Sequence, residues 1–198
     1  MQKMLLLVAA LLAGAGLLTQ CTQNQAANPQ EEAGANAPSE AELVARGGYL
    51  VTIGGCNDCH TPKIMTAHGL DFDSTRLLSG HPANEPAPKV LDLDRVKTGE
   101  VLVFNGGFTS GAGPWGTSFS ANLTPDDTGT GNWTFDQFKK AIREGKSKGM
   151  DGTRPLLPPM PWFNYAKMSD DDLRAVFAYL RSLPPINNAV PTPLPPAS

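Results

Sequence analysis

The string C-x-x-C-H, formed by Cys56, Cys59 and His60, constrains this chain more than any other feature of its sequence. Two cysteines three positions apart lie on the same side of a helical turn, so both thiols can reach one ligand. In an exported protein this string is typical of covalent haem attachment, in which each thiol adds to one vinyl group. His60 follows at once and is placed to ligate the iron. We therefore predict one covalent haem c on Cys56 and Cys59, with His60 as the first axial ligand.

Two other kinds of site also use closely spaced cysteines. A thioredoxin-like redox pair needs a βαβ setting, and no such strand pattern flanks Cys56. A zinc site with four ligands would need both remaining histidines, His68 and His81, at unusual spacing. Haem attachment is therefore the interpretation that the sequence favours.

The N-terminus has the pattern of a secretory signal. The apolar run over residues 4–18 is shorter than the roughly 20 residues that a membrane-spanning helix needs. It ends in the string LTQC at Cys21, which resembles a bacterial lipobox, where the cysteine becomes the acylated first residue. Gln20 departs from the small residue usual at that place, so an ordinary cleaved signal is the alternative. We expect export to the cell envelope or periplasm, with a lipid on Cys21 as membrane anchor.

With Cys21 lipidated and the other two cysteines on haem, all three cysteines are used and no structural disulfide is left. The net charge of −3 is mildly acidic, which argues against nucleic acid as a partner. A polar stretch without apolar periodicity follows Cys21 and predicts a flexible tether. The expected organisation is a signal over 1–20, a tether over 21–38, a folded domain over 39–187 and a Pro-rich tail over 188–198.

Three helices are predicted in the folded domain, each from a capping residue followed by apolar residues at helical spacing. They run from Ser39 toward Cys56, over 135–144, and from Ser169 to Leu183. Gly47 and Gly48 weaken the first helix by roughly 1 kcal/mol each, so we expect another helix to approach there. Between His60 and the second helix the chain is punctuated by Gly and Pro, with one β-like run at 100–104. We expect a long loop-rich insertion.

The methionines supply candidates for the second axial ligand. Met160 lies in the string PPMPW, where three prolines stiffen the loop and hold a thioether at low entropic cost. Met150, in a Gly/Lys loop, is the alternative ligand. Met65 follows the haem motif too closely, and Met168 is expected to pack near the last helix. Core filling is the common role of methionine, but a lone Met in a Pro-rich loop suits ligation better, and we predict Met160.

The order of these features resembles that of class I cytochromes c. Residues 44–61 (VARGGYLVTIGGCNDCHT) and 154–185 (RPLLPPMPWFNYAKMSDDDLRAVFAYLRSLPP) are similar to the monohaem domains associated with periplasmic alcohol and aldehyde dehydrogenases, as is the stretch 119–134. The resemblance implies a mainly α cytochrome c fold, with N-terminal, middle and C-terminal helices around one haem. It also implies that Gly48 and Tyr179 pack where the first and last helices cross.

The resemblance further implies an electron carrier with His60 and Met160 as axial ligands. Its partners would be redox proteins: a dehydrogenase as donor and an oxidase or another cytochrome as acceptor. The chain would then be no enzyme itself, or the electron-transfer subunit of an oxidoreductase complex. A haem sensor or haem enzyme with an open distal site is the alternative, and a lipoprotein whose haem only stabilises the fold is a third. Candidate donors to the haem propionates, by their position in the family-like stretches, are Trp115, Asn122, Trp133 and Arg154.

Overall fold

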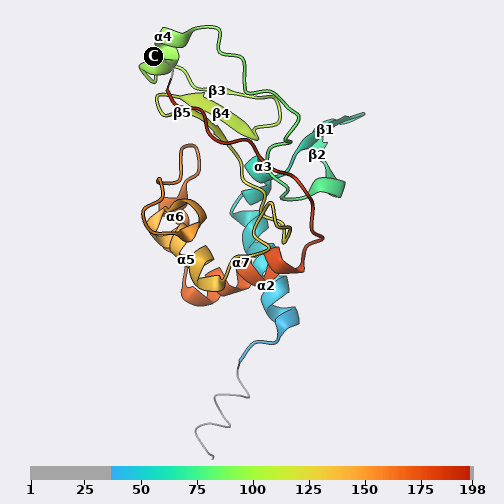
Figure 1. Cartoon of the computed structure of the whole chain (residues 1–198). Helices are drawn as coiled ribbons and strands as arrows, with labels where there is room; N and C mark the ends of the chain where they lie inside the picture. The colour runs from blue at the N-terminus through green and yellow to red at the C-terminus, as the bar shows by residue number, and fades with distance from the viewer. Residues whose placement is uncertain (1–36, 197–198) are drawn as a thin grey trace, which may run out of the picture. The chain divides into compact units, whose positions relative to one another are not determined.

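The computed structural model describes residues 37–196 (Figure 1). The predicted signal, nearly all of the predicted tether and Cys21 lie outside the described residues. Within them, two small sheets are inserted between the helical turn α3 (Cys56–His60) and helix α5 (Phe135–Glu144). None of the helices between residues 37 and 196 is both long enough and apolar enough to span a membrane.

The first and last long helices of this part pack directly against each other. They are α2, Glu40–Ile53, and α7, Asp170–Ser182. A Cβ atom built on Gly47 would lie 2.0 Å from the carbonyl oxygen of Ala175, so a side chain cannot fit there. A Cβ on Gly48 would lie 3.1 Å from the Tyr179 ring, the contact that the resemblance implies. The glycine pair therefore marks a helix crossing, as predicted, and its closest approach is at Gly47.

Side-chain caps fix where the three long helices begin. The caps are Ser39 with Glu42, Thr134 with Gln137, and Ser169. Each capping hydroxyl accepts a hydrogen bond from a backbone N–H of the first turn, which would otherwise have no partner inside the helix. α5 ends at Gly145, whose φ of 63° lies in the left-handed region that glycine adopts without steric cost. The three helix starts predicted from sequence are confirmed.

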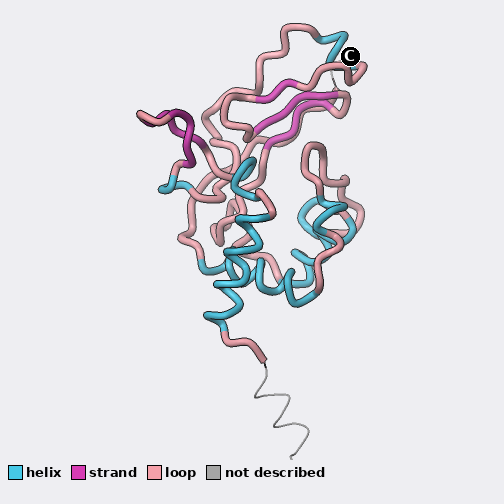
Figure 2. The backbone as a smooth tube through the Cα atoms, turned by 180° about the vertical axis from the view of Figure 1, so that it is seen from behind, coloured by secondary structure: helices cyan, strands magenta, loops and turns pink. Residues whose placement is uncertain are grey.

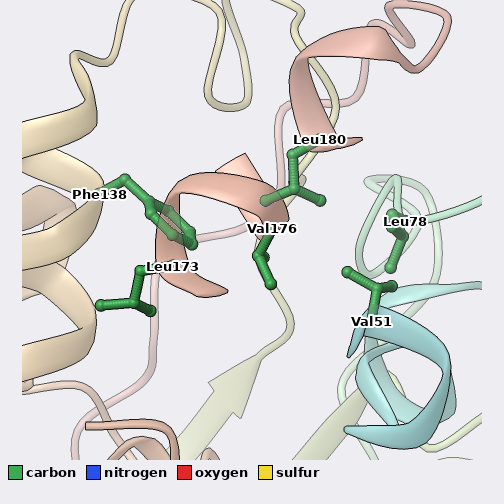
Figure 3. Packing of buried hydrophobic residues seen from close by; sticks show 6 residues of the cluster. All are labelled: Val51, Leu78, Phe138, Leu173, Val176 and Leu180. Carbon is green, nitrogen blue, oxygen red and sulfur yellow. The ribbon is translucent and has the colours of Figure 1, made fainter. Parts of the chain in front are cut away.

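The apolar core lies along α7, between α5 on one side and α2 on the other (Figure 3). Its buried side chains are Val51, Leu78, Phe138, Leu173, Val176 and Leu180. Leu78 comes from the loop after the short 3-10 helix η1 (Ser74–Arg76) and has a φ of 57°. A left-handed backbone costs a leucine roughly 1–2 kcal/mol, and complete burial of its side chain contributes roughly 1.5–3 kcal/mol. Burial therefore offsets the strain at this position.

The stretch that we expected to be loop-rich contains two small antiparallel sheets and a short helix, α4 (Leu93–Lys97), and Figure 2 shows the sheets well apart. The first pairs β1 (Lys63–Thr66) with β2 (Gly69–Phe72). The second has the order β3-β4-β5, with bounds Val103–Phe104, Ser110–Gly113 and Gly116–Phe119. The β-like run at 100–104 contributes only β3. The sequence of β4, SGAG, has low strand propensity, so pairing with its two neighbours rather than local preference makes it a strand.

The segment after α7 runs back along the domain and reaches the second sheet (Figure 1). Leu194 exchanges two backbone hydrogen bonds with Thr117 of β5, at 3.0 and 2.9 Å. Asn188 is 5% exposed, and its Nδ2 donates to the carbonyl oxygens of Ser79 at 2.7 Å and His81 at 2.9 Å. Residues from the predicted Pro-rich tail, to which the sequence assigned no role, thus hold internal loops together.

Candidate haem-attachment site

The C-x-x-C-H string folds into one helical turn, α3, directly after α2. Gly55 precedes it with a φ of 67°, a left-handed conformation that suits glycine. Cys56 and Cys59 are both free thiols on this turn. Burial raises the pKa of Cys56 to about 11 and also raises the pKa of Cys59. Reactive thiols of redox pairs have lowered pKa values, so this environment does not suit a thioredoxin-like pair.

His60, the last residue of α3, is 9% exposed and hydrogen-bonded at one ring nitrogen. Its Nδ1 lies 2.8 Å from the carbonyl oxygen of Ala121. A carbonyl can only accept, so Nδ1 carries the proton and Nε2 carries the lone pair. Within residues 37–196 no hydrogen bond to Nε2 is found. Metal-ligating histidines characteristically donate their second ring N–H to a carbonyl in this way, so His60 fits an iron ligand through Nε2.

Two loops hold His60 and its acceptor in place. The N–H of Gly80 donates to the His60 carbonyl oxygen at 2.7 Å, and the N–H of His81 donates to Ser120 O at 2.9 Å. A Cβ on Gly80 would lie 2.5 Å from Ser120 O, so the loops are in direct backbone contact. Since Ala121 follows Ser120, the same contact positions the carbonyl that accepts from Nδ1.

A lysine that sequence reasoning missed closes the C-terminal end of α3. Lys63 donates from Nζ to the carbonyl oxygens of Asn57 at 3.2 Å, of Thr61 at 2.7 Å, and of Asp58. The last carbonyls of a helix have no partner inside it, and a cation there also interacts favourably with the helix dipole. A basic residue soon after the end of a predicted helix is the sequence signal that points to such a cap.

Next to the second thiol the surface is hollowed. Three exposed apolar side chains, Leu70, Phe72 and Phe108, line this hollow. The rest of the lining is Cys59 and the charged residues Asp58, Lys63 and Asp71. Two of the three apolar side chains come from β2, which the sequence did not predict. The three apolar side chains beside a haem-attachment cysteine suit contact with a hydrophobic prosthetic group.

The predicted second ligand, Met160, is half-buried and closes a tight turn. Its N–H donates to the Leu157 carbonyl oxygen at 3.2 Å, and we call residues 157–160 the Met160 turn. Helix α6 (Trp162–Tyr165) follows, and the Tyr165 hydroxyl donates to Gly54 O at 2.5 Å. This hydrogen bond ties the segment after Met160 to the residue two positions before Cys56.

The other methionines occupy different surroundings. Met150, the alternative ligand, is 49% exposed, and Met65 is 77% exposed on β1. Met168 packs against the apolar core, as expected from its place before the last helix. Met160 thus differs from Met65 and Met150 in being half-buried, and the helix that follows its turn is hydrogen-bonded to Gly54 beside the haem motif.

The four predicted propionate donors have protein partners or lie against the core. Asn122 is 3% exposed and uses both amide hydrogens, toward Thr128 Oγ1 at 3.1 Å and Ile186 O at 2.8 Å. It therefore has no hydrogen left for a carboxylate. Trp115 donates from Nε1 to Ser118 Oγ at 3.3 Å, and Arg154 donates to Pro155 O at 2.9 Å. Trp133 packs against the apolar core.

The remaining histidines do not join Cys56 and Cys59. His81 is fully buried, with Nδ1 at 2.9 Å from Thr109 Oγ1 and Nε2 at 3.2 Å from Glu85 O. His68 is exposed in the turn between β1 and β2. In the part of the chain that the structure describes, no group of three or more His, Cys, Asp or Glu side chains is placed to hold a metal ion.

Comparison with known proteins gives concordant matches. The model of the cytochrome c family matches residues 44–184. The gluconate 2-dehydrogenase cytochrome c subunit of Pantoea cypripedii is 33% identical over 159 residues, which cover 77% of this chain and 27% of that protein. The cytochrome c subunit of alcohol dehydrogenase (quinone) from Gluconobacter oxydans is 31% identical over 142 residues, 71% of this chain and 21% of that protein. The fructose dehydrogenase cytochrome subunit of Gluconobacter japonicus is 30% identical over 171 residues, which cover 86% of this chain and 25% of that protein. The chain spans about a quarter of the length of these relatives.

Proposed function

The chain belongs to the cytochrome c family, and from that premise we propose that it is an electron carrier with one covalent haem c. Cys56 and Cys59 would hold the haem through thioether bonds, and His60 and Met160 would be the axial ligands of the iron. When bound, the haem supplies one-electron redox chemistry, and the protein supplies attachment, ligation and the surroundings that set the potential.

One observation carries the proposal. On the turn that bears both thiols, His60 donates from Nδ1 to Ala121 O and keeps Nε2 free of any hydrogen bond found within residues 37–196. The acceptor fixes the ring orientation and the tautomer and raises the basicity of Nε2. Burial lowers the pKa of His60, which keeps the imidazole neutral, the form that ligates metals.

The second ligand decides between a carrier and an open haem site. A thioether from Met160 favours the reduced iron and raises the potential, as in His/Met cytochromes c. Its turn is backed by hydrogen bonds on both flanks, at Leu156 N to Gly145 O (2.6 Å) and at Tyr165 to Gly54 O. A loop held in this way loses little further entropy when it delivers a ligand.

For partners and location we propose a dehydrogenase as donor and an oxidase or another cytochrome as acceptor, in the cell envelope. The relatives are named as cytochrome subunits of gluconate, alcohol and fructose dehydrogenases, which supports a redox enzyme as partner. The anchor would be a lipid on Cys21 behind the 1–20 signal, with the following residues as tether. Cys21→Ser should then release the protein from membranes, and a mature N-terminus beyond Cys21 would contradict lipidation.

Haem attachment is tested by denaturing the purified holoprotein and extracting it with acidified organic solvent. The haem should stay with the wild-type polypeptide, because thioether bonds survive unfolding. In the Cys56→Ala/Cys59→Ala double variant, any haem bound through His60 should pass into the solvent. Extraction of haem from the wild type would refute covalent attachment.

A further inference from the structure

A buried hydroxyl of the second small sheet is hydrogen-bonded to the Met160 turn. Ser118 lies on β5 and is 8% exposed, and its Oγ lies 2.5 Å from the carbonyl oxygen of Pro158. Pro158 is an inner residue of the Met160 turn, two positions before Met160. The hydroxyl therefore holds the middle of the turn from outside, whereas the bonds at Leu156 and Tyr165 hold its flanks.

The direction of this hydrogen bond follows from the neighbours of the hydroxyl. A serine hydroxyl has one proton to donate, and Oγ lies 3.3 Å from Gly111 O, farther than from Pro158 O. The proton therefore goes to Pro158. Trp115 donates from Nε1 to the same Oγ at 3.3 Å, which leaves the hydroxyl both donating and accepting. The indole N–H of Trp115, a candidate donor to a propionate, thus donates to Ser118.

The position of Ser118 is itself well fixed. On one side β5 pairs with β4, with Ser118 opposite Gly111. On the other side its neighbour Thr117 pairs with Leu194 from the C-terminal segment. A strand paired along one edge and bridged at Thr117 on the other is a stiff support for a contact to a loop, so the sheet can hold the Met160 turn in one conformation.

We propose that Ser118 is a positioning residue for Met160, which acts by keeping the Met160 turn closed. The inference rests on the proposed ligation by Met160. The bond between Oγ and the Pro158 carbonyl exists only while the turn is closed, so it stabilises the closed state selectively. A neutral hydrogen bond of this kind shifts such an equilibrium by about three- to tenfold.

The chain offers a matched control on the neighbouring strand. Ser110 lies on β4 and is 3% exposed, and its Oγ has no hydrogen-bond partner among the described residues. Ser110→Ala and Ser118→Ala each remove one buried hydroxyl from the same sheet, but only Ser118→Ala breaks a bond to the Met160 turn. The loss of a buried hydroxyl by itself would affect both variants alike, and Trp115→Phe separates the loss of the Trp115 hydrogen bond from the loss of the bond to Pro158.

The test is a titration of the oxidised holoprotein with imidazole, which competes with Met160 for the iron when the turn opens. The near-infrared sulfur-to-iron band is followed in the same samples. Ser118→Ala should bind imidazole about three- to tenfold more tightly than wild type, and Ser110→Ala should match wild type. Ser118→Thr keeps the hydroxyl and should restore most of the wild-type affinity. If Ser118→Ala gives no soluble holoprotein, the same titration is made with Trp115→Phe, for which we expect a smaller increase in imidazole affinity.

The outcomes separate this inference from the ligation on which it rests. If the band is present and Met160→Ala abolishes it, but Ser118→Ala behaves like Ser110→Ala, the role of Ser118 is refuted and the ligation stands. The role of Ser118 is also refuted if Ser118→Thr does not restore the wild-type imidazole affinity. Where Trp115→Phe replaces Ser118→Ala, an unchanged imidazole affinity refutes that role as well. If the wild type has no such band and Met160→Ala changes nothing, the ligation by Met160 fails, and the inference fails with it.

Discussion

The crossing of α2 and α7 makes a sharp prediction about two adjacent glycines. Replacing either glycine by alanine inside α2 raises helix propensity by about 1 kcal/mol. At Gly47 the new methyl would lie 2.0 Å from Ala175 O, a backbone atom that cannot rotate away. Carbon and carbonyl oxygen approach to about 3.3 Å at closest, so the helices would have to separate by roughly 1.3 Å.

Such a separation loosens the buried cluster to which Val51 of α2 and both Val176 and Leu180 of α7 belong. Overpacking of this severity costs about 3 kcal/mol, at the upper end of the usual range. After the gain in propensity, Gly47→Ala should destabilise the domain by about 2 kcal/mol, a fall in Tm of about 4–8 °C for a domain of this size.

Gly48→Ala is the matched control, because its methyl would meet only the Tyr179 ring, at 3.1 Å. A partly exposed ring can shift by a few tenths of an ångström, and the propensity gain offsets that cost. We expect a change within about 1 kcal/mol of zero. The assay is thermal and guanidinium unfolding of the two holoproteins. Equal stability of Gly47→Ala and Gly48→Ala would refute the described approach of the helices.

Three further predictions concern single contacts. Asn188→Ala should destabilise the domain by about 2–3 kcal/mol in guanidinium unfolding, because it leaves the carbonyls of Ser79 and His81 without their donor. The control is Ser79→Ala, which should cost far less, because the Ser79 Oγ has no partner among the described residues. Tyr165→Phe should lower the unfolding temperature by a few degrees, because it removes the hydrogen bond to Gly54 O, and an unchanged Tm would show that this contact contributes nothing. Hydrogen bonds from Lys140 and Lys146 lower the pKa of Asp151 from 3.8 to about 2, so the stabilisation by this carboxylate is present above pH 4 and is lost as the pH falls toward 2. Wild type should accordingly exceed Asp151→Asn in stability at pH 5 and converge with it near pH 2, in unfolding curves measured across that range.

The features predicted correctly from sequence are those set by residues close together in the chain. A capping box such as that of Thr134 and Gln137 needs residues only three positions apart, and the C-x-x-C-H turn is local as well. The helix crossing was also predictable, because two glycines inside a helix are costly unless another backbone approaches. The resemblance to dehydrogenase-associated cytochromes c is confirmed by the family match and by the named relatives.

The features that the sequence did not reveal depend on partners far along the chain. Asn122 donates to the carbonyl of Ile186, 64 positions away, and no local pattern announces such a pair. β4 has little strand propensity and becomes a strand through its neighbours on both sides. The contact of Ser118 with Pro158 joins segments 40 positions apart, so neither residue looks functional in the sequence alone. Candidate ligands can therefore be found from a motif, whereas the groups that position them require the structure.

The most direct test of the central claim is a redox titration of the purified holoprotein, followed in the near-infrared. The account predicts one reversible one-electron transition and a low-spin oxidised form with the sulfur-to-iron band, which Met160→Ala removes while lowering the potential. A wild-type protein that is high-spin and binds carbon monoxide readily would contradict it, and would favour a haem sensor or haem enzyme with an open distal site.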